Sequence, residues 1–130
     1  MAHLYTSAQA SFLGGEFDLL NDTIKCVLVK SAYTYSAAHD FLNDLSTNAV
    51  GTAQTLTTPD TTDGVFSADN ATFTAVAATT ACDRVAIYKH VTNSGDSPLI
   101  AILDLAAEVT PDGGDITLTW DAGGIFAFTG

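Results

Sequence analysis

The sequence predicts a mainly β fold, an antiparallel β-barrel or sandwich (jelly-roll-like), with two short N-terminal helices. From residue 49 onward, short runs rich in Thr, Val and Ala alternate with Gly, Asp and Pro. The turn-forming residues recur at nearly regular spacing, as they do in antiparallel sandwiches and barrels. No helical pattern separates the later runs, so a parallel sheet with crossover helices is not expected.

The first helix is predicted over residues 6–13. Thr6 is a capping residue, helix formers follow it, and Gly14 ends the pattern. We expect this helix to hold Leu4, Phe12 and Leu13 against the core.

A strand and a second helix are predicted next. Residues 23–30 form a β-branched run and the best early strand. Residues 36–45 place Phe41, Leu42 and Leu45 at helical spacing, with Ser36 as the expected N-cap.

The remaining elements are predicted strands. Residues 84–91 and 98–105 are long and apolar and should pair antiparallel across the loop 92–97. Pro98 cannot donate a ladder hydrogen bond, so it belongs at a strand start or on an edge. The turn at 121–124 is expected to join the last two strands in the same way. The predicted strands are 51–57, 71–77, 84–91, 98–105, 115–120 and 125–128.

The predicted core follows from the alternation of apolar residues. Val85 and Ile87 should share one face of their strand, and Ile100 and Ile102 one face of theirs, because side chains alternate with period two. The expected core residues are Phe12, Phe17, Ile24, Val27, Val29, Phe41, Leu45, Phe73, Val85, Ile87, Ile100, Ile102, Leu118 and Phe126.

Length and charge limit the possible partners. The 130 residues fit a single domain, 1–130, with an ordinary hydrophobic content of 47%. Four Lys and Arg against fifteen Asp and Glu give a net charge of −11. Nucleic acid and anionic membranes are bound through Lys and Arg, so neither is an expected partner. The sequence also shows no apolar run long enough to span a membrane and no signal-peptide pattern.

The cysteines do not form a metal-binding pattern. Cys26 and Cys82 lie in separate apolar runs without a neighbouring cysteine at ligand spacing. We expect two buried thiols. A disulfide between them would require their strands to be neighbours.

Other catalytic and metal-binding patterns are also missing. His3, His39 and His90 are scattered without triad or metal-ligand spacing. The aspartates of the predicted turns do not follow the calcium-loop spacing, although a cation there stays open. We therefore expect no catalytic residue, no cofactor and no metal site, and the protein is predicted not to be an enzyme. The aspartates concerned are Asp60, Asp63, Asp112 and Asp115.

Several segments together resemble a family of small virion structural proteins of tailed bacteriophages. In the C-terminal half these are Val-Ala-Ile-Tyr-Lys (85–89), residues 96–104, Val-Thr-Pro-Asp-Gly-Gly-Asp-Ile-Thr-Leu-Thr-Trp (109–120) and Gly-Ile-Phe (124–126). In the N-terminal half they are Phe-Leu-Gly-Gly-Glu-Phe-Asp (12–18), Asp-Thr-Ile-Lys-Cys-Val-Leu-Val (22–29) and residues 33–45. The resemblance spans most of the chain and rests on a diffuse pattern without a catalytic signature.

The resemblance implies a capsid decoration (cement) protein that binds the outer head shell. Its implied partners are the major capsid protein and other copies of itself, as a homotrimer, after assembly in the host bacterial cytoplasm. The alternative is a neck, tail or head-fibre component with a receptor- or glycan-binding β module. A small β-barrel enzyme or ligand binder is the third hypothesis.

Apolar residues at the two ends of the sequence are the predicted assembly contacts. Subunits that bind a shell must commit apolar surface to contacts. The last segment is equally compatible with a final core strand. The predicted contacts are Ala2, His3, Leu4, Tyr5, Ile125, Phe126 and Phe128.

Overall fold

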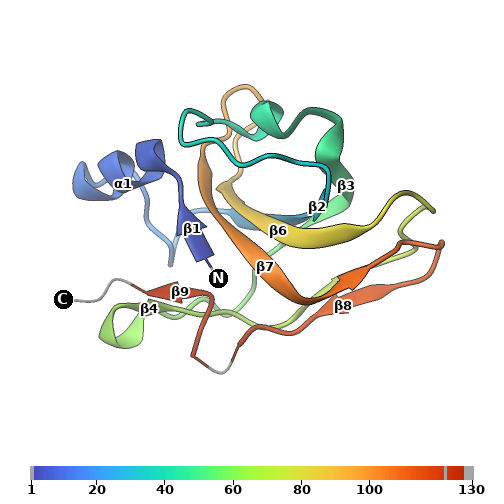
Figure 1. Ribbon diagram of the computed structural model, residues 1–130. Helices are drawn as coiled ribbons and strands as arrows, with labels where there is room; N and C mark the ends of the chain where they lie inside the picture. Colours follow the sequence, from blue (N-terminus) through green and yellow to red (C-terminus); the bar gives the residue numbers. More distant parts are fainter. Residues whose placement is uncertain (1, 122, 128–130) are drawn as a thin grey trace.

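A computed structural model describes residues 2–121 and 123–127 of the chain (Figure 1). Three helical elements are present in this part: α1 (Thr6–Leu13) and the 3-10 helices η1 (Leu42–Asn48) and η2 (Thr62–Gly64). The strands are β1 (Ala2–Leu4), β2 (Ile24–Lys30), β3 (Ala49–Thr55), β4 (Val65–Phe66), β5 (Ala71–Phe73), β6 (Cys82–Lys89), β7 (Leu99–Val109), β8 (Ile116–Leu118) and β9 (Phe126–Ala127).

The strands form one five-stranded sheet and two small ribbons. The sheet has the order β1-β7-β6-β2-β3, and the ribbons pair β4 with β9 and β5 with β8. Every pairing is antiparallel. The prediction of a mainly β, antiparallel fold is therefore confirmed.

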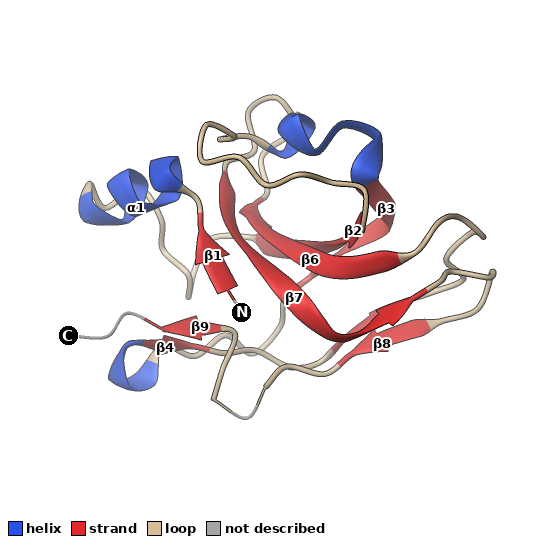
Figure 2. Ribbon diagram, viewed as in Figure 1, coloured by secondary structure: helices blue, strands red, loops and turns tan. Residues whose placement is uncertain are grey.

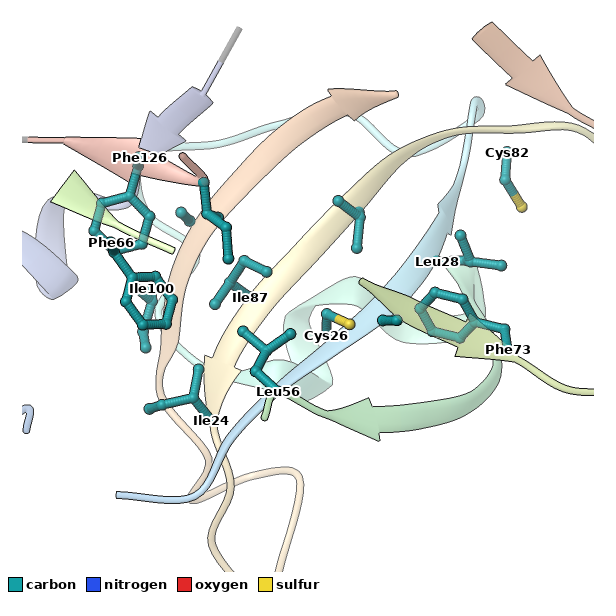
Figure 3. Packing of buried hydrophobic residues seen from close by; sticks show 14 of the residues in the cluster. Ile24, Cys26, Leu28, Leu56, Phe66, Phe73, Cys82, Ile87, Ile100 and Phe126 are labelled. Carbon is teal, nitrogen blue, oxygen red and sulfur yellow. The ribbon is translucent and has the colours of Figure 1, made fainter. Parts of the chain in front are cut away.

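Both faces of the five-stranded sheet are covered by other parts of the same chain. Figure 2 shows α1 and the loop with η1 on one side of the sheet and the two ribbons on the other. Each side has its own apolar cluster: Ile87, Phe66 and Phe73 belong to the ribbon side (Figure 3), and Tyr5 and Leu99 to the helix side. The sheet is thus the middle of three layers.

The predicted hairpin between residues 84–91 and 98–105 is confirmed. Strands β6 and β7 pair from Cys82 with Val109 to Tyr88 with Leu99, and Pro98 directly precedes β7. A β-bulge lies in this register, because Ile87 pairs with Ala101 and leaves Ile100 as an extra residue.

The bulge changes the faces on which β7 side chains lie. Ile100 belongs to the ribbon-side cluster, whereas Ile102 belongs to the helix-side cluster. The prediction that these two isoleucines share a face is wrong for this reason. The extra residue is on β7, so the alternation along β6 is kept here. Val85 and Ile87 of β6 share the ribbon-side cluster, as predicted.

Long-range pairing replaces the predicted final hairpin. The strands on either side of the turn at 121–124, β8 and β9, do not pair with each other. Instead, β8 pairs with β5 and β9 pairs with β4. Two pairing partners, β1 and β4, were not predicted. Both are very short, with three and two residues, and carry no local strand signal.

The first helix is confirmed, but its predicted ends are partly wrong. Its N-cap is Tyr5, which uses no side-chain cap, and the Tyr5 carbonyl accepts a hydrogen bond from Gln9 N. Tyr5, Ala8 and the half-buried Phe12 lie at helical spacing and face inward. Leu13, the next residue, points away and is 91% exposed, so its predicted packing against the core is wrong.

The second helix is shorter and later than predicted, because the backbone around Phe41 bonds elsewhere. Leu42 N donates to Ser97 O, and Leu99 N donates to Asp40 O. The Asp44 carboxylate accepts from the backbone amides of Asp40 and Phe41. Helical geometry therefore starts at residue 42. The Ser36 side chain accepts a hydrogen bond from Ala38 N and the Ser36 carbonyl accepts one from His39 N, both within a turn.

Most predicted core residues are buried. Four are only half-buried at the edges of the clusters: Phe12, Phe17, Phe41 and Leu118. The other ten are less than 8% exposed.

The two cysteines are both buried and free. Their strands β2 and β6 are neighbours, but Cys82 pairs with Lys30 while Cys26 pairs with Ile87. A separation of four residues along a strand is about 13 Å, well beyond the reach of a disulfide.

Candidate functional site

An apolar surface lies where α1 ends. It consists of Leu4, Phe12, Leu13, Phe17, Leu19 and Leu20, and is called the Phe12 surface below. Leu13 is 91% exposed and Leu20 is 50% exposed. Gly14 and Gly15 turn the chain between them, and Gly15 has a φ of 74°, which favours glycine. Leu13 and Leu20 each line one open hollow.

The two hollows share Phe12 as a wall. The first, of about 520 Å³, is lined by Leu4, Gln9, Phe12 and Leu13. The second, of about 470 Å³, lies between the 15–20 segment and the β4–β9 ribbon; among its lining residues are Phe12, Phe17, Leu19, Leu20, Phe66 and Phe126.

Aromatic contacts fix the walls of the second hollow. Phe12 packs edge-on against Phe17 at 5.0 Å between ring centroids, and Phe126 lies 6.2 Å from Phe12 and 5.3 Å from Phe66. Figure 3 shows Phe66 and Phe126 side by side, coming from β4 and β9. Ile125 N donates to Phe66 O at 2.7 Å, which ties the segment before β9 to β4. The hollow is therefore preformed.

One carboxylate residue lines this hollow. Asp18 lines it, and its oxygens accept hydrogen bonds from Leu20 N, Asn21 N and the Asn21 side chain. These bonds, first of all the one from the Asn21 side chain, lower the pKa of Asp18 below its usual 3.8. Glu16 and Asp63 are exposed and lie next to lining residues in the sequence, and the Glu16 carboxylate accepts a hydrogen bond from Ser11 Oγ. Asp18 thus places a negative charge at the edge of the hollow at neutral pH.

Cations are distributed unevenly over the fold. Every Lys and Arg of the chain lies on β2 or β6, namely Lys25, Lys30, Arg84 and Lys89. Only Lys89 reaches the 16–22 segment, where its Nζ donates to Glu16 O at 3.2 Å and pairs with Asp22 at 3.3 Å. The layer formed by the ribbons carries carboxylates without a Lys or Arg.

The predicted assembly contacts fall into three groups. Tyr5, Ile125 and Phe126 are 0%, 3% and 7% exposed. Their side chains pack in the apolar clusters of the subunit itself, and that of Phe126 also lines the second hollow. Ala2, His3 and Leu4 form β1, and Leu4 is half-buried on the Phe12 surface. Phe128 lies outside the described residues.

Tyr5 takes part in a polar network under the loop 31–41. Its hydroxyl lies 2.9 Å from that of Tyr33, which lies 2.7 Å from His39 Nδ1. Burial raises the pKa values of both tyrosines. The Arg84 guanidinium lies over the Tyr33 ring, 5.2 Å from its centroid, and donates to the carbonyls of Lys30, Ser31 and Tyr33. This arrangement holds the loop on the sheet and is structural.

Three of the four aspartates of the predicted turns accept hydrogen bonds from backbone amides. Asp60 accepts from Thr62, Asp112 from Gly114 N, and Asp115 from Ala75 N. Within residues 2–121 and 123–127, no three His, Cys, Asp or Glu residues come together as a group that could hold a metal ion. No helix in the same part of the chain is long and apolar enough to cross a membrane.

The exposed part of the Phe12 surface was not predicted as a site. Leu13 was assigned to the core because it is a leucine in a helical segment. A sharper signal was present: Tyr5, Ala8 and Phe12 define the inward face, and Leu13 is rotated by about 100° from Phe12. The exposure of Leu20 has no such signal, because it depends on a loop.

No family model matches the chain, and no curated protein matches its sequence significantly.

Proposed function

We propose that this chain is a non-enzymatic structural subunit of a bacteriophage virion, a capsid decoration (cement) protein that binds and stabilises the outer head shell. Its partners are the major capsid protein and other copies of the chain, as a homotrimer. It acts on the outer capsid surface after assembly in the host bacterial cytoplasm. Two things support the proposal: the resemblance described above and the Phe12 surface.

The Phe12 surface is the observation that carries the proposal. An isolated exposed leucine needs no explanation, but Leu13 and Leu20 flank two apolar hollows that share one wall. Covering such a surface with a partner removes apolar area from water, at about 25 cal/mol for each Å². A subunit that binds its partners by burying apolar surface area needs an exposed apolar surface of this kind.

For the finer fold we propose a sandwich, jelly-roll-like, in preference to a closed barrel. The sheet and the ribbons share one apolar cluster between them. Among the described strands, β1 and β3 are the two edges of the sheet, and no pairing joins them.

The test is binding to shells that lack the protein. Purified protein is incubated with such shells, bound copies are counted by mass, and the particles are imaged. Saturation over the whole shell is expected. Binding confined to one vertex or to the tail would favour the neck, tail or head-fibre alternative, and absence of binding would refute both.

Matched variants link the binding to the Phe12 surface. The double variant Leu13→Ser, Leu20→Ser should lose most shell binding and keep its stability, since both side chains are exposed. Val91→Ser is the control, because Val91 is also an exposed apolar side chain, at 38%, but lies elsewhere. Equal loss in both variants would refute the assignment of the surface.

A further inference from the structure

The edge of the second hollow distinguishes it from an ordinary apolar depression. Asp18 lines the hollow, and three hydrogen bonds hold its carboxylate. Asp63, in η2, is exposed between the lining residues Thr61 and Gly64. Glu16, also exposed, directly follows the lining residue Gly15. An apolar floor is therefore combined with a negative edge.

No salt bridge from a Lys or Arg to Asp18, Asp63 or the Glu16 carboxylate is found among the described residues. All four Lys and Arg residues lie on β2 and β6, and Lys89, which reaches the segment, pairs with Asp22. A charge that is left unpaired at the edge of an interface selects its partner by sign. A partner that carries cations would complement this edge.

We propose that the Phe12 surface binds a segment of a partner protein in which large apolar side chains are flanked by Lys or Arg. The apolar side chains enter the hollows beside Phe12, and the basic side chains face Glu16, Asp18 and Asp63. A second copy of this chain is a poor occupant, because it would bring its own negative edge and a net charge of −11. That the partner is a shell protein rests on the proposed function, whereas its chemistry is inferred from this surface.

The inference is tested with labelled peptides and the isolated full-length protein. The probe is fluorescein-labelled Lys-Lys-Phe-Leu-Leu-Lys-Lys, followed by fluorescence anisotropy. The comparison peptides replace the lysines by Glu, or the apolar residues by Ser. The probe should bind at least about tenfold more tightly than either comparison peptide, because both the apolar and the charged contacts are required. Its binding should weaken above about 0.15 M salt, where charges more than about 8 Å apart are screened.

Variants then place the probe on the surface. The double variant Leu13→Ser, Leu20→Ser should weaken probe binding about tenfold or more, since apolar area is no longer covered. Glu16→Gln with Asp63→Asn should weaken the Lys probe severalfold and reduce its salt dependence. Val91→Ser and Asp96→Asn are the controls, as both residues are exposed outside this surface, and should bind like wild type.

Three results would overturn the inference. These are absence of probe binding, equal binding of the Lys and Glu peptides, and a change in the oligomeric state of the purified protein caused by the double leucine variant. The last result would assign the surface to a second copy. Failure of the shell experiment with the expected peptide results would refute the proposed function and leave this inference standing.

Discussion

Replacing Gly124 by alanine should destabilise the fold strongly, because the turn before β9 packs closely on β4 at this residue. Gly124 has a φ of 99°, a conformation that L side chains rarely adopt. A Cβ atom there would lie 2.3 Å from Val65 Cγ1 and 3.1 Å from Phe66 O. The residue stands between a turn, closed by its N–H bonding Asp121 O, and Ile125, which bonds β4. The 2.3 Å approach requires Val65 or the turn to shift, and the second contact is with the backbone of β4.

The expected loss is the sum of two effects. A left-handed conformation costs a non-glycine residue about 1–2 kcal/mol. Overpacking a well-packed position costs about 1–3 kcal/mol. Gly124→Ala should therefore lower the free energy of unfolding by about 2–5 kcal/mol.

Two other glycines separate these effects. Gly113 has nearly the same φ, 98°, but a Cβ there would meet nothing within 4 Å, so Gly113→Ala reports the conformational cost alone. Gly123→Ala should be nearly neutral, since its Cβ would make only an ordinary contact, 3.7 Å from Asp121 Oδ2.

Urea unfolding followed by the fluorescence of Trp120, the one tryptophan of the chain, measures all three variants. If Gly124→Ala lost no more stability than Gly113→Ala, close packing of the turn on Val65 would be refuted.

Three further predictions concern the core and its polar network. The thiols of Cys26 and Cys82 should react with a thiol reagent only after unfolding, because both are 0% exposed and burial raises their pKa values, that of Cys26 to about 12; rapid reaction in the native state would contradict this. Asp44→Ala should lower the free energy of unfolding by about 0.5–2 kcal/mol near neutral pH, because two backbone amides lose their acceptor. Those amides hold the pKa of Asp44 below its usual 3.8, so the carboxylate stabilises the fold above that pH, and the difference between variant and wild type should shrink as the pH falls below it; a difference independent of pH would refute the role of the charge. Tyr33→Phe should lower the free energy of unfolding by about 1–3 kcal/mol, because it leaves the buried Tyr5 hydroxyl without that partner; a Tyr5→Phe, Tyr33→Phe double variant as unstable as the sum of the single variants would show that the hydroxyls do not interact.

The strands that could be predicted from the sequence carry their signal locally. Strands β6 and β7 are long apolar runs on either side of a turn-rich loop, so neighbouring residues suffice to identify the hairpin. The same holds for α1, whose inward residues repeat at helical spacing. The bounds differ by a few residues where the ends depend on other parts of the fold, as for β5, which ends at Phe73.

The parts that could not be predicted depend on contacts between distant residues. The pairing of β4 with β9 joins residues 65–66 to 126–127, and no local pattern records it. The bulge at Ile100 comes from the register between two strands, and the late start of η1 from hydrogen bonds to residues 97 and 99. The Phe12 surface is of the same kind, since its second hollow exists only when Phe66 and Phe126 arrive from the ribbon.

Coverage of both sheet faces explains why a partner would bind at the end of α1. Antiparallel sheets usually keep one face in solvent, and their strands then alternate between apolar and polar residues. In β2, by contrast, Cys26, Val27, Leu28 and Val29 are all buried in succession, because the ribbons cover one face and α1 together with the loop that holds η1 covers the other. The broad faces of the sheet are thus already used by the chain itself, and Tyr5, Ile125 and Phe126 are used with them. Apolar side chains remain exposed mainly where the covering layers end, and that place is the junction of α1 with the β4–β9 ribbon. Within the part of the chain that the structure describes, a partner can therefore contact apolar side chains at Leu13 and Leu20 without opening the subunit's own core.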